Sequence, residues 1–137
     1  MALENAKPCL VLLVDDETRS ARVLAKMLRE DGYDVELAYD GAAAIARLAR
    51  SPAPDVLLTD YRMAHADGIA VAEYARSRRA NMPILMLTGY PEIAMRLVEE
   101  LRPRPVIIPK PLTYNDVTRE IERARESARL AQARPAE

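Results

Sequence analysis

Apolar residues along the chain fall into two alternating kinds of segment. Short runs that are apolar throughout, or that alternate strictly with polar positions, are separated by longer runs with helical spacing. Short runs with two apolar faces are typical of interior strands of a parallel sheet, whereas strict alternation is typical of an edge strand, here residues 33–38. The predicted strands are Cys9–Val14, Tyr33–Ala38, Val56–Thr59, Ile84–Leu87 and Val106–Ile108.

The longer runs predict five helices. Residues that commonly start or stop helices lie at their ends, namely Gly32, Asp40, Asp67-Gly68, Pro91, and Thr113 or Asn115. Apolar residues at helical spacing predict the buried faces, which are Ala21, Leu24, Met27 and Leu28, then Ile45, Leu48 and Ala49, then Val71, Tyr74 and Ala75, then Ile93, Leu97 and Leu101, then Val117, Ile121, Ala124 and Ala128. Five β-α units in succession imply right-handed crossovers and one α/β domain, with a parallel sheet covered on both faces.

Composition narrows the class of protein. The 137 residues include no Phe and no Trp, so we expect an aliphatic core. A formal net charge of −1 does not fit a dedicated nucleic-acid binder. The single cysteine, Cys9, allows no internal disulfide, and no apolar run reaches the ~18 residues of a membrane span. With no basic-then-apolar signal peptide at the N-terminus, we expect a soluble, cytoplasmic protein without membrane contact.

Polar residues that could bind a ligand or take part in a reaction follow four of the five predicted strands. In an open α/β sheet, ligands bind at the carboxyl ends of the strands. The residues found there are Asp15 and Asp16 after the first strand, Asp60 after the third, Thr88 and Gly89 after the fourth, and Lys110 and Pro111 after the fifth. If the first and third strands are neighbours, three carboxylates converge in one pocket.

Such a pocket favours phosphoryl chemistry. Oxygen ligands suit Mg²⁺, which often bridges to a phosphate. An aspartate can act as a nucleophile and become an aspartyl-phosphate, while Lys110 offers an ammonium and Thr88 a hydroxyl. Phosphoryl transfer relies mainly on positioning and on neutralising charge, which this set of residues provides.

The same residues resemble the receiver domain of two-component response regulators. The matching motifs are Asp15-Asp16, Asp60-x-x-Met63-x-x-x-Asp67-Gly68, Thr88 and Lys110-Pro111, each at a predicted strand end. The resemblance implies a single (βα)5 flavodoxin-like sandwich with a parallel sheet of strand order 2-1-3-4-5. We expect the receiver domain to span residues 8–125, with an N-terminal extension of residues 1–7 and a C-terminal helix extension or tail of residues 126–137.

The resemblance also implies roles for single residues. Asp60 would accept a phosphoryl group from a histidine kinase or a histidine phosphotransfer protein. Mg²⁺ would be held by Asp15, Asp16, Asp60 and the backbone carbonyl of Arg62, with Asp15 acting mainly through a water. Lys110 would pair with Asp60 and later with the phosphoryl group, which Thr88 would also bind. The remaining positions expected to modulate the site are Gly89, Tyr90, Ile107 and Pro111, with a cis bond before Pro111.

The sequence departs from the family pattern beside these residues. Ala64 stands where proline usually follows the methionine, and Pro109 precedes the lysine. Ile107 stands where receivers usually carry a Phe or Tyr that turns inward as the threonine moves. We therefore expect signalling here to use movement of residues 88–91 in place of that aromatic coupling. Arg62 and Tyr90 predict shielding of the phosphoryl group from water, and His65 is interpreted as a solvated loop residue.

The leading interpretation is a phosphorylation-controlled signalling switch and not an enzyme, with at most autophosphatase activity. With no residues for a DNA-binding domain after residue 130, we expect output through contact with an unidentified partner protein, no direct nucleic-acid binding, and scope for a homodimer. One alternative is a receiver segment of a hybrid histidine kinase or of a longer regulator. A second is a Mg²⁺-dependent phosphohydrolase with an Asp nucleophile. That class of enzyme has the motif Asp-x-Asp-x-Thr after its first strand, whereas this chain has Asp15-Asp16-Glu17-Thr18.

Overall fold

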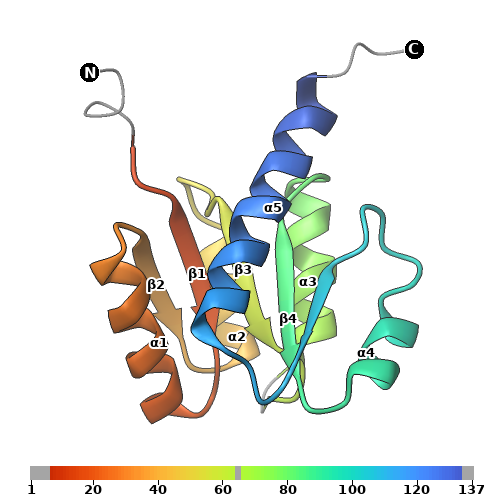
Figure 1. Ribbon diagram of the computed structural model, residues 1–137. Coiled ribbons are helices and arrows are strands. Elements are labelled where there is room, and N and C mark those ends of the chain that lie inside the picture. Colours follow the sequence, from red (N-terminus) through yellow and green to blue (C-terminus); the bar gives the residue numbers. More distant parts are fainter. Residues whose placement is uncertain (1–6, 64–65, 134–137) are drawn as a thin grey trace.

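The computed structural model describes residues 7–63 and 66–133 (Figure 1), so the expectations for Ala64 and His65 concern residues outside the described part. Five strands alternate with five helices in chain order. The elements are β1 (Leu10–Val14), α1 (Thr18–Glu30), β2 (Asp34–Ala38), α2 (Gly41–Leu48), β3 (Val56–Asp60), α3 (Gly68–Arg78), β4 (Ile84–Thr88), α4 (Pro91–Leu97), β5 (Val106–Pro109) and α5 (Tyr114–Ala133).

The five strands form one parallel sheet in the order β2-β1-β3-β4-β5, which confirms the order that the resemblance implied. The three central strands are the most apolar, and every residue of β3 and β4 is buried. β2 lies at one edge, where the exposed residues Asp34 and Glu36 alternate with positions that are buried or half-buried. The alternating pattern of this segment therefore marked the edge strand correctly.

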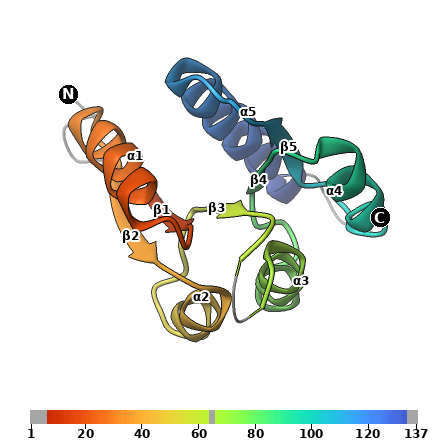
Figure 2. The ribbon, with the colours of Figure 1, turned by 90° about the horizontal axis from the view of Figure 1, so that it is seen from below.

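Helices cover both faces of the sheet (Figure 2). Strand side chains alternate between the faces, so each face has its own core. On one face, strand residues such as Leu13 and Leu58 pack with Leu28 of α1 and Ile121 of α5. On the other face, α2, α3 and α4 contribute mainly alanine and valine. The small side chains let these helices pack close to the strands.

Three predicted helix faces were partly wrong. In α2, Ala49 is exposed just after the end of the helix, and Ala44 takes the buried position. In α4, Ala94 and Val98 are buried, whereas Ile93 and Leu97 are about half exposed. The true core face therefore lies one position further along the chain, because alanine can fill a core position as well as a larger residue does. In α1, Met27 is exposed, and Ala25 takes the buried position.

Side chains cap four of the helices. Asp40 and Asp67 accept hydrogen bonds from Ala43 N and Ala70 N, as their positions predicted, and Thr113 accepts one from Asp116 N at the start of α5. α1 is capped by Glu17, whose carboxylate accepts from Arg19 N at 3.0 Å. Because Glu17 caps α1, Asp16 is not needed for that task.

α5 is the longest helix and its last turns extend past the sheet (Figure 1). Two tyrosine hydrogen bonds connect α5 to the segment around the end of α1, which covers the same face of the sheet. Tyr33 donates to Glu122 at 2.5 Å, and Tyr114 donates to Asp31 at 2.6 Å. None of the helices in the described residues is long and apolar enough to cross a membrane.

Candidate functional site

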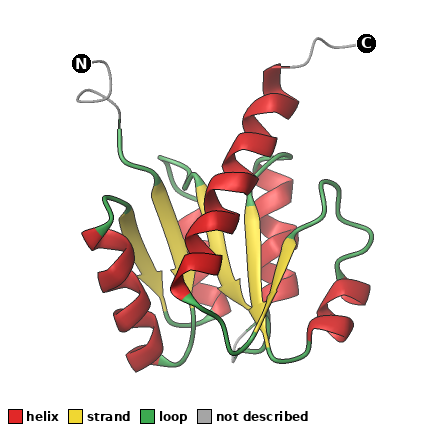
Figure 3. Cartoon of the chain, viewed as in Figure 1, coloured by secondary structure: helices red, strands yellow, loops and turns green. Residues whose placement is uncertain are grey.

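The carboxyl ends of the parallel strands meet at one edge of the sheet, the lower edge in Figure 3. The register of β1, β3, β4 and β5 places the last residues of neighbouring strands side by side. This edge brings together the residues that were predicted to form the site, which are Asp15, Asp16, Asp60, Thr88 and Lys110.

Three carboxylates form the centre of the site. Asp15, Asp16 and Asp60 each place one oxygen within 4.8 Å of the others. Asp15 and Asp60 are buried, and Asp16 is exposed. Asp15 Oδ1 also accepts a hydrogen bond from Glu17 N at 2.9 Å, which fixes its side chain. Asp60 is the last residue of the buried strand β3, so its backbone has little freedom.

Lys110 supplies a cation to this cluster. Its Nζ lies 2.7 Å from Asp60 Oδ1, and its backbone N donates to Thr88 O at 2.8 Å, which anchors it to the end of β4. The bond between Lys110 and Pro111 is cis, as the resemblance implied.

Burial and, after it, the neighbouring Asp15 raise the pKa of Asp60, Lys110 lowers it, and together these effects leave the pKa at about 7. The positive charge of Lys110 therefore does not fully offset the effect of burial and of the neighbouring carboxylate on the pKa of Asp60. Apart from the Lys110 ion pair, the buried Asp60 Oδ1 has no well-aligned hydrogen bond among the described residues. An oxygen-rich cluster with an unsatisfied acceptor fits a hard divalent cation such as Mg²⁺.

A cavity of about 220 Å³ opens beside Asp60, lined by Leu87, Thr88, Gly89, Arg62, Tyr90 and Lys110. Thr88 is buried, and its Oγ1 accepts a hydrogen bond from Tyr90 N at 2.8 Å. The Arg62 guanidinium carbon lies 5.2 Å from the centroid of the Tyr90 ring. The two side chains therefore border the cavity together.

The sequence predicted that Arg62 and Tyr90 both shield the phosphoryl group, but it did not predict that they contact each other. They belong to separate loops, after β3 and β4, and only the folded chain brings them together. The sequence feature that could have suggested this contact is that Arg62 lies two residues after Asp60 and Tyr90 lies two residues after Thr88.

Ile107 does not reach the cavity. It is half-buried in β5 and packs against the core beneath α2, α3 and α4. Together with Met95, Val98 and Pro105 it lines a separate hollow of about 360 Å³ between α4 and β5. Pro111 lies on the other side of Lys110, in a groove that also contains Leu112 and Val23.

Two glycines shape the loops around the site. A Cβ on Gly41 would lie 2.0 Å from Ala66 O, and one on Gly68 would lie 2.1 Å from Asp60 O. Ala66 itself has a φ of 85°, in the left-handed region. The loop after β3 therefore packs directly against the start of α2. Sequence reasoning identified Gly68 as a turn residue but missed the role of Gly41.

Comparisons with known proteins agree with this geometry. The model of the response regulator receiver domain family matches residues 11–122. The response regulator MprA of Mycobacterium avium (strain 104) is 33% identical over 125 residues, which cover 91% of this chain and 52% of that protein. The transcriptional regulatory protein ZraR of Salmonella typhimurium is 34% identical over 115 residues, which cover 83% of this chain and 26% of that protein. The chain thus spans about half or less of these curated relatives.

Solved structures of the same family superpose closely. A response regulator receiver protein from Sinorhizobium medicae has a TM-score of 0.80 at 27% identity, with 89% of this chain and 98% of that chain covered. The receiver domain of NtrX from Brucella abortus has a TM-score of 0.76 at 26% identity, with 85% and 98% covered. The chain therefore belongs to the response regulator receiver domain family, the signalling modules of two-component systems.

Proposed function

We propose that Asp60 is the phosphoacceptor of this receiver domain. A carboxylate oxygen of Asp60 attacks the phosphorus of a phosphohistidine on a histidine kinase or histidine phosphotransfer protein. The P–N bond breaks, and the imidazole keeps its electron pair and takes up a proton. The observation that carries the proposal is the Lys110 Nζ, 2.7 Å from Asp60 Oδ1 inside a cluster of three carboxylates.

The other site residues complete the charge balance. Asp15, Asp16, Asp60 and the backbone carbonyl of Arg62 would hold Mg²⁺, with Asp15 acting mainly through a water. When bound, Mg²⁺ supplies positive charge next to the transferred group. Lys110 favours the ionised form of Asp60, and it then shares its charge with a phosphoryl oxygen. The Thr88 hydroxyl exchanges its hydrogen bond with Tyr90 N for one to the phosphoryl group.

A groove beside the site supports docking of the phosphohistidine partner. It runs between α1 and the loop after β5, and Asp15 and Lys110 line it along with apolar residues. Val23 is 56% exposed and Met27 is 37% exposed in this groove. Exposed apolar side chains next to a reactive carboxylate suit contact with the helices of a protein donor.

Intact-mass measurement after incubation with acetyl phosphate and Mg²⁺ tests the proposal. We expect a gain of one phosphoryl group on the wild type and none on Asp60→Ala. Lys110→Ala should retain the acceptor but slow labelling. Steady turnover of a generic phosphate ester, without one-equivalent labelling of Asp60, would support the phosphohydrolase alternative instead.

We further propose that this segment signals through protein contact, as the receiver of a phosphorelay. The relatives named above are longer than this chain, which supports the alternative of a receiver within a longer regulator or hybrid kinase. A stand-alone receiver and a receiver within a longer protein would both be phosphorylated on Asp60. The length of the full gene product separates them.

A further inference from the structure

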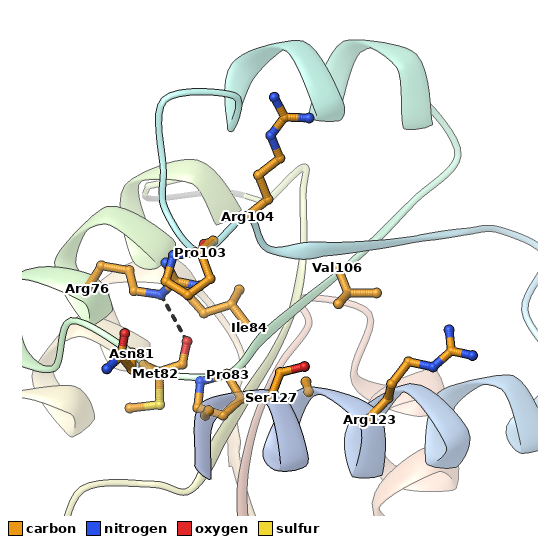
Figure 4. Close-up of a pocket in the computed structure, with 12 residues that line it drawn as sticks. Arg76, Asn81, Met82, Pro83, Ile84, Pro103, Arg104, Val106, Arg123 and Ser127 are labelled. Atoms are coloured by element: carbon orange, nitrogen blue, oxygen red, sulfur yellow. Dashed lines mark hydrogen bonds between the residues drawn. The ribbon is translucent and has the colours of Figure 1, made fainter. Parts of the chain in front are cut away.

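Another hollow lies beside α5 at the start of β4 and β5, at the opposite end of the sheet from Asp60. Figure 4 shows its lining residues. Its volume is about 170 Å³. We call it the α5 hollow. Three segments line it, from the end of α3 to the start of β4, from the loop before β5 into β5, and from the middle of α5. The lining residues are Arg76, Asn81, Met82, Pro83, Ile84, Pro103, Arg104, Val106, Arg123, Ala124, Ser127 and Ala128.

The hollow exists because α5 changes from large to small residues along one face. Val117 and Ile121 fill the space over the sheet and are fully buried. One and two turns further, the same face carries the small residues Ala124 and Ala128, which line the hollow together with Val106. The floor is therefore apolar but unfilled. A cavity of about 150 Å³ with apolar walls accommodates a benzene-sized group, so this one has room for a single apolar side chain.

The walls of the α5 hollow are held in place before any partner arrives. Arg76 donates from Nε to Met82 O at 2.9 Å and from Nη1 to Pro103 O. This one side chain therefore links the turn before β4 to the loop before β5. Pre-formed walls reduce the ordering cost of binding.

The rim of the hollow is cationic. Arg104 is exposed and has no hydrogen-bond or ion-pair partner among the described residues, and the Arg123 side chain is 69% exposed with a single carboxylate contact, to Glu120 at 3.5 Å. Among the described residues that line the hollow there is no Asp or Glu. The two guanidinium groups extend from different elements at separate places on the rim (Figure 4). Carboxylates on either side of an inserted side chain would meet both.

We propose that the α5 hollow is a docking site for an acidic segment of a partner protein that inserts one aliphatic or aromatic side chain between Arg104 and Arg123. The apolar floor requires the inserted side chain, and the rim requires its acidic neighbours. The described residues that line the hollow include no Phe, Tyr or Trp on which a base could stack, which disfavours nucleic acid. The site lies away from Asp60 and does not depend on the proposed phosphorylation.

Selection from a library of random peptides tests the site without knowing the partner. The full chain serves as bait, and Ala128→Leu, which fills the floor without changing charge, serves for counter-selection. Ala131→Leu is the matched control, because it adds the same side chain to an exposed position of α5 outside the hollow. We expect the enriched peptides to combine an apolar residue with neighbouring Asp or Glu.

An enriched peptide should bind Ala128→Leu at least about tenfold more weakly, and Arg104→Glu likewise, while Ala131→Leu keeps the wild-type affinity. Amide NMR signals of Val106 and Ser127 should shift on binding. The proposal is overturned if wild type and Ala128→Leu enrich the same peptides, if those peptides lack acidic residues, or if duplex DNA binds with the same dependence on Arg104. Labelling of Asp60 by acetyl phosphate should be unchanged in all these variants, so failure here is distinct from failure of the proposed function.

Discussion

A single methyl group at Gly41 would disturb the loop that follows the proposed phosphoacceptor. A Cβ at this position would lie 2.0 Å from the backbone oxygen of Ala66, so the loop would have to move. We expect Gly41→Ala to lower the free energy of unfolding by about 1–3 kcal/mol, the usual cost of overpacking, as measured by urea titration. Labelling of Asp60 should also slow, because the same loop carries the Arg62 carbonyl.

Gly89→Ala is the matched control for stability. A Cβ on Gly89 would have no atom within 4 Å, so the free energy of unfolding should change by less than about 0.5 kcal/mol. Equal stability of the two variants would show that the loop does not press on Gly41.

We expect the pair Arg62 and Tyr90 to affect the lifetime of the phosphoryl group and not the labelling of Asp60. They border the cavity beside Asp60 and contact each other by a cation–π interaction. We expect Arg62→Ala with Tyr90→Ala to shorten the lifetime of the phosphoryl group several-fold, because water then reaches it more freely.

The lifetime is measured by intact mass over time after excess acetyl phosphate is removed. Ile93→Ala, an exposed change on α4 outside the cavity, should leave the decay rate as it is in wild type. An unchanged decay rate in the double variant would rule out shielding by this pair.

At the scale of elements, a buried arginine fastens α2 to the edge of the sheet. Arg47 contacts Glu36 of β2 at 2.5 Å and donates to the backbone oxygens of Arg50 and Pro52. Its guanidinium lowers the pKa of Glu36. A carboxylate with a lowered native pKa stabilises the fold above its unfolded pKa, and this contribution is lost as the pH falls through the native pKa.

We therefore expect Glu36→Gln to lower the melting temperature at pH 7, and we expect the difference to disappear once the pH falls below the lowered native pKa of Glu36, where the side chain is protonated. Melting curves of both proteins from pH 3 to pH 8 give the comparison. A difference that stays constant across this range would show that the ion pair makes no contribution.

The link between β4 and α4 is the element expected to carry the signal. Ile107 packs into the core and cannot turn toward Thr88 as an aromatic ring would. With an aromatic switch missing, movement should be confined to residues 88–91. We expect a beryllofluoride phosphoryl mimic to shift the amide NMR signals of Gly89 and Tyr90 strongly and the methyl signals of Ile107 only weakly. Unchanged signals at Gly89 and Tyr90 would contradict this route.

At the scale of the whole molecule, the alternation of strand-like and helix-like segments predicted five β-α units and a parallel sheet, whereas the strand order 2-1-3-4-5 came from the resemblance to receiver domains. Strand ends in a parallel sheet share one edge, so residues such as Asp15, Asp60 and Lys110 could be placed together without coordinates. The orientation of α4 was missed because Ala94 competes with Ile93 for the core, and pattern alone does not rank them. Contacts between loops, such as Arg62 with Tyr90, depend on backbone paths that periodicity does not encode.

We expect the charge cluster at the carboxyl edge, which could hold a metal ion, to link folding of the whole domain to metal binding. Asp60 has a native pKa of about 7, against about 3.9 when unfolded. Between these values the native state binds more protons than the unfolded state, so stability falls as the pH rises through this window. Without metal, we expect Asp60→Asn to melt at a higher temperature than wild type at pH 8, and to match it near pH 4.

With Mg²⁺ present, we expect wild type to melt at a higher temperature than Asp60→Asn at pH 8, because a ligand that binds only the native state stabilises that state. At pH 8, added Mg²⁺ should raise the melting temperature of wild type and leave that of Asp60→Asn nearly unchanged. Asp34→Asn, which removes an exposed carboxylate at the opposite end of the sheet, should respond like wild type. An equal response of Asp60→Asn and wild type would place the bound ion elsewhere. A wild type without any response would show that these three carboxylates rely on Lys110 alone.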